Sequence, residues 1–144
     1  MNRVELAVSL FQKGFSCSQA VLTAYCDCFG LDREMALRIA SGFGGGMARM
    51  AQTCGAVSGA FMIVGPKHGG VDAEERKAKE KTYEAMREFA NRFIARHGSL
   101  ICRELLECDI STPEGFQLAK EKKLYAVVCP GLVKTAAEIV EEMI

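Results

Sequence analysis

The sequence lacks a surplus of charge of either sign, because 18 lysine and arginine residues balance 18 aspartate and glutamate residues. A chain without net charge has no electrostatic footprint for nucleic acid or for an anionic membrane surface. Long apolar runs are also missing: the longest nearly apolar stretch, residues 56–66, is too short to cross a bilayer and contains Ser58. We therefore expect neither a nucleic-acid partner nor insertion into a membrane.

Targeting and linker signals are missing as well. Glu5 interrupts the apolar stretch that a secretory signal peptide would need near the N-terminus. There is no internal repeat, low-complexity tract or linker rich in proline and serine, and a length of 144 residues suits one domain. We expect a single cysteine-rich helical domain over residues 1–144, located in the cytoplasm, where cysteines are usually reduced.

Helix signals dominate what is present. Apolar periodicity, capping residues and stop signals predict helices over residues 2–13, 32–41, 53–65 and 72–97, and others that start at or just after residues 16, 99, 113 and 130. For the helix over 53–65, a start soon after Gly46 is the alternative to the favoured start at Thr53. The pair Gly65-Pro66 is expected to end the third of these ranges. The helix over 72–97 is expected to bury a stripe made of Tyr83, Met86, Phe89, Ala90, Phe93 and Ile94. The fold class predicted is all-α, a compact single-domain bundle of about six or seven helices.

Seven cysteines in 144 residues are the one compositional anomaly. Four of them lie in or beside the first turn of a predicted helix, where free backbone N–H groups and the helix dipole favour the thiolate. The other three lie late in their helices and are interpreted as packing or accessory thiols. The first group is Cys17, Cys54, Cys102 and Cys129, and the second is Cys26, Cys28 and Cys108. Since free cysteine often behaves as a small buried hydrophobe, packing stays an alternative for the first group too.

Two glycine-containing segments accompany these cysteines. In the motif that follows Cys54, Gly55 and Gly59 lie on one helix face, and their cost of about 1 kcal/mol each indicates close approach of another helix or of a ligand. Residues 42–46 contain four glycines and are interpreted as a lid or tight turn, with a cradle for an anion or small cofactor as the alternative. They are not a dinucleotide fingerprint, because Met47 stands where that pattern needs glycine.

The order of these motifs resembles a known family. The motifs are Cys17 before an Ala-Val helix, glycine-rich residues 42–46, Cys54-Gly-Ala-Val-Ser-Gly59, Cys102-Arg-Glu-Leu, and Cys129 before the last helix. Together they are similar to the C_GCAxxG_C_C family, to which a redox activity is ascribed. The resemblance covers essentially the whole chain and implies that Cys17, Cys54, Cys102 and Cys129 are the family's four cysteines. Cys108 competes for the last position with a less suitable spacing.

Three functions compete at this point. The first is thiol–disulfide chemistry, as in an oxidoreductase, with Cys17, Cys54, Cys102 and Cys129 as catalytic candidates and no cofactor required. The usual Cys-x-x-Cys is absent, so cysteines distant in sequence must pair, and Cys17 and Cys54 are expected to be the more reactive two. The second function is binding of zinc or an iron–sulfur cluster by the same four thiolates, although no two are close in sequence.

The third function is a noncatalytic module that binds a small ligand or a partner, with the cysteines in its core. For the redox function the partner is an unknown redox protein or small-molecule substrate, and a homo-oligomer is compatible with every alternative. Histidine chemistry has little support. His68 and His97 both lie beside glycines near helix ends and are interpreted as solvated or capping residues.

Overall fold

Helix starts in the computed structural model, which describes residues 1–144, follow the capping residues of the sequence. The side chains of Asn2, Ser16, Asp32 and Thr112 each accept a hydrogen bond from a backbone N–H in the first turn that they precede. The all-α class is confirmed. The elements are α1 (Arg3–Gln12), α2 (Cys17–Tyr25), the 3₁₀ helix η1 (Cys26–Phe29), α3 (Arg33–Ala40), α4 (Gly55–His68), α5 (Arg76–His97), α6 (Cys102–Leu105), α7 (Pro113–Glu121), α8 (Leu124–Val127) and α9 (Cys129–Met143).

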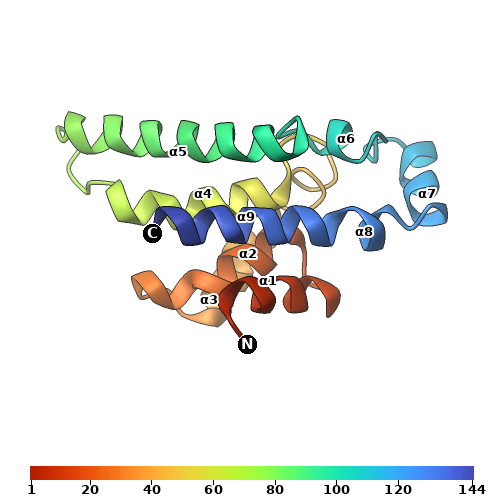
Figure 1. The fold of residues 1–144 in the computed structure, drawn as a ribbon, viewed down its shortest axis with the longest axis horizontal. Coiled ribbons are helices and arrows are strands. Elements are labelled where there is room, and N and C mark those ends of the chain that lie inside the picture. Colours follow the sequence, from red (N-terminus) through yellow and green to blue (C-terminus); the bar gives the residue numbers. More distant parts are fainter.

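The helices lie in three layers (Figure 1). The long helix α5 forms one outer layer, α4 and α9 lie beneath it, and α1, α2 and α3 form the opposite layer. Helix α5 contacts both α4 and α9, while α2 contacts α4 on one side and α1 on the other. One hydrophobic cluster of 31 buried residues runs through these contacts. None of the helices combines the length and the apolar character that crossing a bilayer requires.

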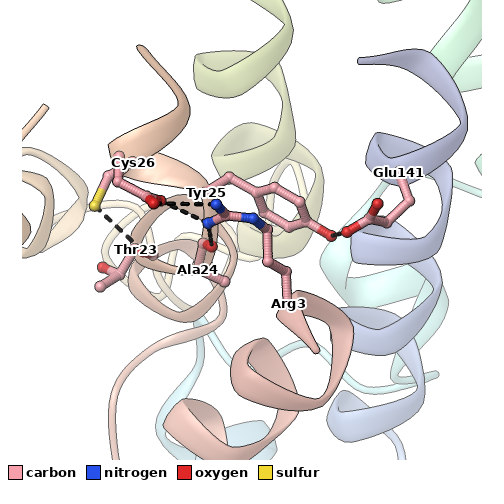
Figure 2. A network of polar contacts seen from close by, with 7 residues as sticks. Arg3, Thr23, Ala24, Tyr25, Cys26 and Glu141 are labelled. Carbon is pink, nitrogen blue, oxygen red and sulfur yellow. Dashed lines mark hydrogen bonds and ion pairs between the residues drawn. The ribbon is translucent and has the colours of Figure 1, made fainter. Parts of the chain in front are cut away.

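A buried tyrosine ties the first helices to the last one (Figure 2). The ring of Tyr25, at the end of α2, is fully buried, and its hydroxyl lies 2.9 Å from a carboxylate oxygen of Glu141 and 3.1 Å from the carbonyl of Ala137. Arg3 of α1 pairs with Asp27 at 2.6 Å, and its guanidinium lies 5.7 Å from the centre of the Tyr25 ring. Burial, and then the Glu141 carboxylate, raise the pKa of Tyr25 above its ordinary value.

The end of α4 differs from the prediction. The helix continues through Gly65 and Pro66 to His68, where the sequence indicated a stop. Proline removes the backbone donor that would bond to the residue four before it, and it crowds the residue directly before it. Pro66 lies in the last turn, and Gly65 has no Cβ to crowd the proline ring. The N–H of Gly69 then closes the helix on the carbonyl of Gly65 at 2.7 Å.

The start and the buried face of α5 also differ from the prediction. The helix begins at Arg76, because the Asp72 carboxylate accepts a hydrogen bond from the backbone of Glu74 in a turn that precedes it. Within the expected stripe, Phe89 and Phe93 are fully buried, while the remaining members are only partly covered or exposed. In particular, Tyr83 is 49% exposed and Ile94 is 40% exposed. The buried face is narrow because α5 is an outer layer that packs on one side only.

Candidate functional site

One cavity, with a volume of about 820 Å³, is lined by four cysteines that come from four different helix starts. Cys17 begins α2, Cys54 precedes α4, Cys102 begins α6 and Cys129 begins α9. The remaining three cysteines do not line this cavity. The division of the seven cysteines into two groups, made from helix position, therefore coincides with a division in space. All seven are free thiols in this structure.

Close packing of α4 on α2 places Cys54 beside Cys17. A Cβ at Gly55 would lie 3.2 Å from the Cβ of Cys17, and one at Gly59 would lie 2.8 Å from the carbonyl oxygen of Ser18. Only glycine allows the two helices to approach this closely. The prediction of close approach at the glycine motif is confirmed, and the element that approaches is the start of α2.

An isolated antiparallel bridge sets the position of Cys54 relative to Cys102. The bridge pairs Thr53 with Ile101, and the backbone N–H of Cys54 donates to the carbonyl of Leu100 at 2.8 Å. Cys54 therefore lies opposite Leu100, and Cys102 is two residues further along the facing segment. Diagonal neighbours in such a ladder share one face and lie about 7–8 Å apart. The bridge therefore places Cys102 diagonally across from Cys54, and both line the cavity.

Cys129 and Cys17 form a pair. Cys129 is the first residue of α9 and is followed by Pro130, so the helix begins one residue earlier than the start at Pro130 that the sequence indicated. Both thiols are buried and line the cavity, and each is the largest influence on the pKa of the other. The pKa of Cys17 is raised and that of Cys129 is lowered, which makes Cys17 the protonated member of the pair and Cys129 the thiolate.

The pKa is lowered only at Cys129, and there the Cys17 thiol lowers it, whereas the sequence predicted that the helix starts would lower the pKa of all four thiols. This interaction lowers the pKa of Cys129 below the ordinary value of 9.0. Burial raises the pKa of Cys54 to about 11, although the N–H groups of Ala56 and Val57 act in the opposite direction. Burial likewise raises the pKa of Cys102 to about 12, and the pKa of Cys17 is raised by its role as donor to Cys129 and by burial. Loss of solvation outweighs the helix N-terminus at these three positions.

The glycine-rich segment is a tight turn that also lines the cavity. Five consecutive residues, Gly45 to Arg49, have positive φ values between 51° and 69°. A left-handed backbone costs roughly 1–2 kcal/mol at each residue other than glycine, so Met47, Ala48 and Arg49 are strained. Such strain persists only where surrounding contacts impose it, and here the N–H of Ala48 donates to the carbonyl of Gly42 at 2.9 Å.

Three lining residues have no signal in the sequence. Arg49 lies with its guanidinium carbon 4.5 Å from the centre of the Phe116 ring, and both residues line the cavity. Tyr125 comes from α8, within a stretch that resembles a strand in the sequence, and its buried hydroxyl has no hydrogen-bonding partner. Only the folded arrangement of the left-handed turn, α7 and α8 brings these side chains to the cysteines.

The thiols and histidines outside the cavity have local partners. The Cys26 thiol donates to the carbonyl of Thr23 at 3.2 Å, and the Cys108 thiol donates to the carbonyl of Gly115 at 3.2 Å. His97 lies 2.7 Å from the hydroxyl of Thr135 and packs on Phe93, and burial lowers its pKa. These contacts fit the packing roles expected from the sequence for Cys26 and Cys108.

The geometry of the four cavity cysteines does not match that of a metal site. No three histidine, cysteine, aspartate or glutamate side chains are arranged so that they could hold a metal ion. The four cavity cysteines share one cavity without meeting that arrangement. The ligand set that the zinc or iron–sulfur alternative needs is therefore not assembled in this arrangement.

The fold and the cavity define a class of protein: a helical bundle in which cysteines from four helix starts share one cavity. Residues 15–143 match the model of the family described as "Putative redox-active protein (C_GCAxxG_C_C)", and the chain belongs to this family. The resemblance noted in the sequence is thereby confirmed. Neither the curated proteins nor the solved structures contain a match to the chain.

Proposed function

We propose that the protein carries out thiol–disulfide exchange in its four-cysteine cavity, with Cys129 as the nucleophile and Cys17 as the resolving thiol. The observation that carries the proposal is that Cys17 and Cys129, the first residues of α2 and α9, line the same cavity, where they shift each other's pKa in opposite directions. It replaces the sequence-based preference for Cys17 and Cys54 as the more reactive two, because burial raises the pKa of Cys54.

The exchange needs no cofactor. The Cys129 thiolate attacks one sulfur of a substrate disulfide, the substrate S–S bond breaks, and the departing thiolate takes up a proton. Cys17 then loses its proton and attacks the Cys129 sulfur of the mixed disulfide. The second half of the substrate leaves as a thiol, the substrate is reduced by two electrons, and Cys17 and Cys129 become oxidised to a disulfide.

Cys54 and Cys102 supply a second dithiol at the same cavity. Their raised pKa values keep them protonated near neutral pH, so they are weak nucleophiles there. In the proposal they receive the disulfide from Cys17 and Cys129 by internal exchange, which changes the position of the S–S bond and not the oxidation state. We place this cycle in the cytoplasm, where a dithiol is kept reduced between turnovers.

Mild oxidation followed by peptide mapping tests the proposal. The reduced protein is treated with a small disulfide, remaining thiols are blocked, and disulfide-linked peptides are identified by mass spectrometry. We expect a Cys17–Cys129 link in the wild type, and in Cys17→Ser a mixed disulfide that stays on Cys129. Cys26→Ser is the matched control, because Cys26 is as deeply buried as Cys129 but lies outside the cavity.

The results that contradict the proposal are equally specific. If Cys129 stays reduced while Cys26 or Cys28 reacts, the cavity is not the reactive site. A Cys54–Cys102 link is expected once the disulfide has been passed on, but a link that still forms there in Cys129→Ser would assign the chemistry to the other pair. A wild type in which all seven thiols stay reduced would support the noncatalytic binding module instead.

A further inference from the structure

The wall of the four-cysteine cavity contains one charged residue, Arg49, and no carboxylate. The guanidinium carbon of Arg49 lies 4.5 Å from the centre of the Phe116 ring, and the ammonium of Lys120 lies 4.1 Å from the centre of the same ring. The five ion pairs of the structure are made by other residues, so neither cation has a carboxylate partner. Two positive charges without a carboxylate partner therefore lie against the Phe116 ring.

Hydrogen-bond donors at the same cavity are uncommitted as well. The backbone N–H groups of Gly44, Gly45 and Gly46 donate to no acceptor of the protein, and all three residues line the cavity. The hydroxyl of Tyr125 is buried without a partner. Buried polar groups are nearly always satisfied, so a donor that lacks a partner indicates a ligand or an ordered water. Successive backbone N–H groups in a tight turn form concavities that bind anions.

The strained backbone keeps these groups in place. Arg49 is itself in the left-handed conformation, with φ of 60°, at the end of the turn that contains the glycines. Gly46 allows that turn to lie against Cys102, since a Cβ at position 46 would be 2.7 Å from the Cβ of Cys102. The positive and donor-rich side of the cavity is thus held next to the thiols.

We infer that the cavity binds a small disulfide that carries a carboxylate or another anionic group, with the anion at Arg49 and the glycine turn and the disulfide facing Cys129. The inference rests on the proposed function and adds the chemical class of the substrate. A volume of about 820 Å³ is within the usual range of small-molecule sites, so a compound of modest size fits. Charge-assisted hydrogen bonds from guanidinium and backbone N–H groups select an anion over a neutral or cationic analogue.

The covalent step is the one described above, with the anionic group unchanged. The S–S bond of the substrate breaks, one half forms a mixed disulfide with Cys129 and the other leaves as a thiol that keeps its carboxylate. Attack by Cys17 then releases the second half as a thiol. Both products carry the negative charge that bound the substrate.

Three disulfides of similar size and different charge test the inference. The probes are 3,3′-dithiodipropionate, which is a dianion, 2-hydroxyethyl disulfide, which is neutral, and cystamine, which is a dication. The rate of mixed-disulfide formation at Cys129 is measured for each at low ionic strength, because salt screens the discrimination. After division by each probe's rate with a free small thiol, we expect the dianion to react fastest and the dication slowest.

Arg49→Gln and Lys120→Gln locate the discrimination. Arg49→Gln is expected to lower the relative rate of the dianion by about threefold or more while leaving the neutral probe unchanged, as loss of one charge-assisted contact implies, and Lys120→Gln is expected to lower it less because Lys120 does not line the cavity. Arg87→Gln is the matched control, because Arg87 is exposed on α5 away from the cavity. Thermal unfolding of each variant shows whether the fold is retained.

The outcomes separate the inference from the proposed function. If Cys129 reacts equally with all three probes and Arg49→Gln changes nothing, the anion preference is wrong and the exchange chemistry stands. If Cys129 reacts with none of them, the proposed function itself fails. An equal loss of rate for the dianion and the neutral probe in Arg49→Gln would also overturn the inference, because it would show a packing role for the arginine.

Discussion

Gly46 lies directly against Cys102: a Cβ added to this glycine would be 2.7 Å from the Cβ of Cys102. The same atom would also be 2.6 Å from the backbone nitrogen of Gln52. Gly46 has a φ of +67°, so its backbone conformation alone disfavours every other residue type. The glycine-rich turn and the cysteine are therefore coupled through a contact that no larger residue could make.

Gly46→Ala is expected to destabilise the protein and loosen the turn. The left-handed conformation and the overlap with neighbouring atoms together cost about 2–4 kcal/mol. The free energy of unfolding in denaturant measures the loss, and alkylation of Cys102 is expected to become faster as the turn moves away. Gly42→Ala is the control, since a Cβ there meets nothing within 4 Å and its φ is not positive. Equal stability of the two variants would contradict the contact.

Gly59→Ala tests the approach of α4 to α2. Alanine favours a helix over glycine by about 1 kcal/mol, so helix propensity alone predicts a gain in stability. The added Cβ would lie 2.8 Å from the carbonyl oxygen of Ser18, and we expect the overlap to produce a net loss of about 1–3 kcal/mol. In α9, Gly131→Ala meets nothing within 4 Å and is expected to be neutral or stabilising. Denaturant unfolding of both variants checks the opposite signs.

Tyr25→Phe tests the network that joins α2 to α9. The ring remains buried, and only the hydroxyl contacts with Glu141 and Ala137 are removed, so the expected cost is about 0.5–1.5 kcal/mol. Tyr83→Phe is the control, because Tyr83 is 49% exposed and its loss of a hydroxyl is expected to leave the unfolding free energy unchanged. Equal effects of the two substitutions would mean that the Tyr25 hydroxyl contributes nothing to stability.

Local signals explain why much of the fold was predictable. The caps Ser16 and Thr112 act on the backbone of their own first turn, so the sequence alone locates these helix starts. The end of α4 was missed because the continuation through Pro66 depends on how the last turn is completed, not on local propensity. The exposure of Ile94 was missed because the width of the buried face depends on which helices cover α5.

The candidate site was only partly predictable for a related reason. Helix-start positions and the family motif identify the four cysteines, and the cavity that they share agrees with that selection. Their pKa order does not follow from position, since burial is a property of the whole fold and reverses the effect of the helix start at Cys54 and Cys102. Arg49 and Tyr125 carry no motif and reach the cavity only through the left-handed turn and α8.

The interaction of Cys17 with Cys129 predicts a distinctive pH dependence. The pKa of Cys129 is lowered from 9.0, so its thiolate is present below the pH range of an ordinary cysteine and is lost as the pH falls through the lowered value. The rate of Cys129 alkylation by iodoacetamide, followed by peptide mass spectrometry across pH, is therefore expected to rise with a midpoint below 9.0. The pKa of Cys17 is raised, so its own alkylation is expected only at higher pH.

Removing the donor reverses the shift. In Cys17→Ala the Cys129 thiolate loses the neighbour that lowers its pKa, so the midpoint is expected to rise toward the ordinary value of 9.0. Cys17→Ser keeps a hydrogen-bond donor at this position and is expected to shift the midpoint of Cys129 alkylation less. Cys26→Ser is the control. The Cys26 sulfur bonds only to the Thr23 carbonyl, so this substitution is expected to leave the pH profile of Cys129 unchanged. A Cys17→Ala profile that superimposes on the wild type would show that Cys17 does not stabilise the Cys129 thiolate.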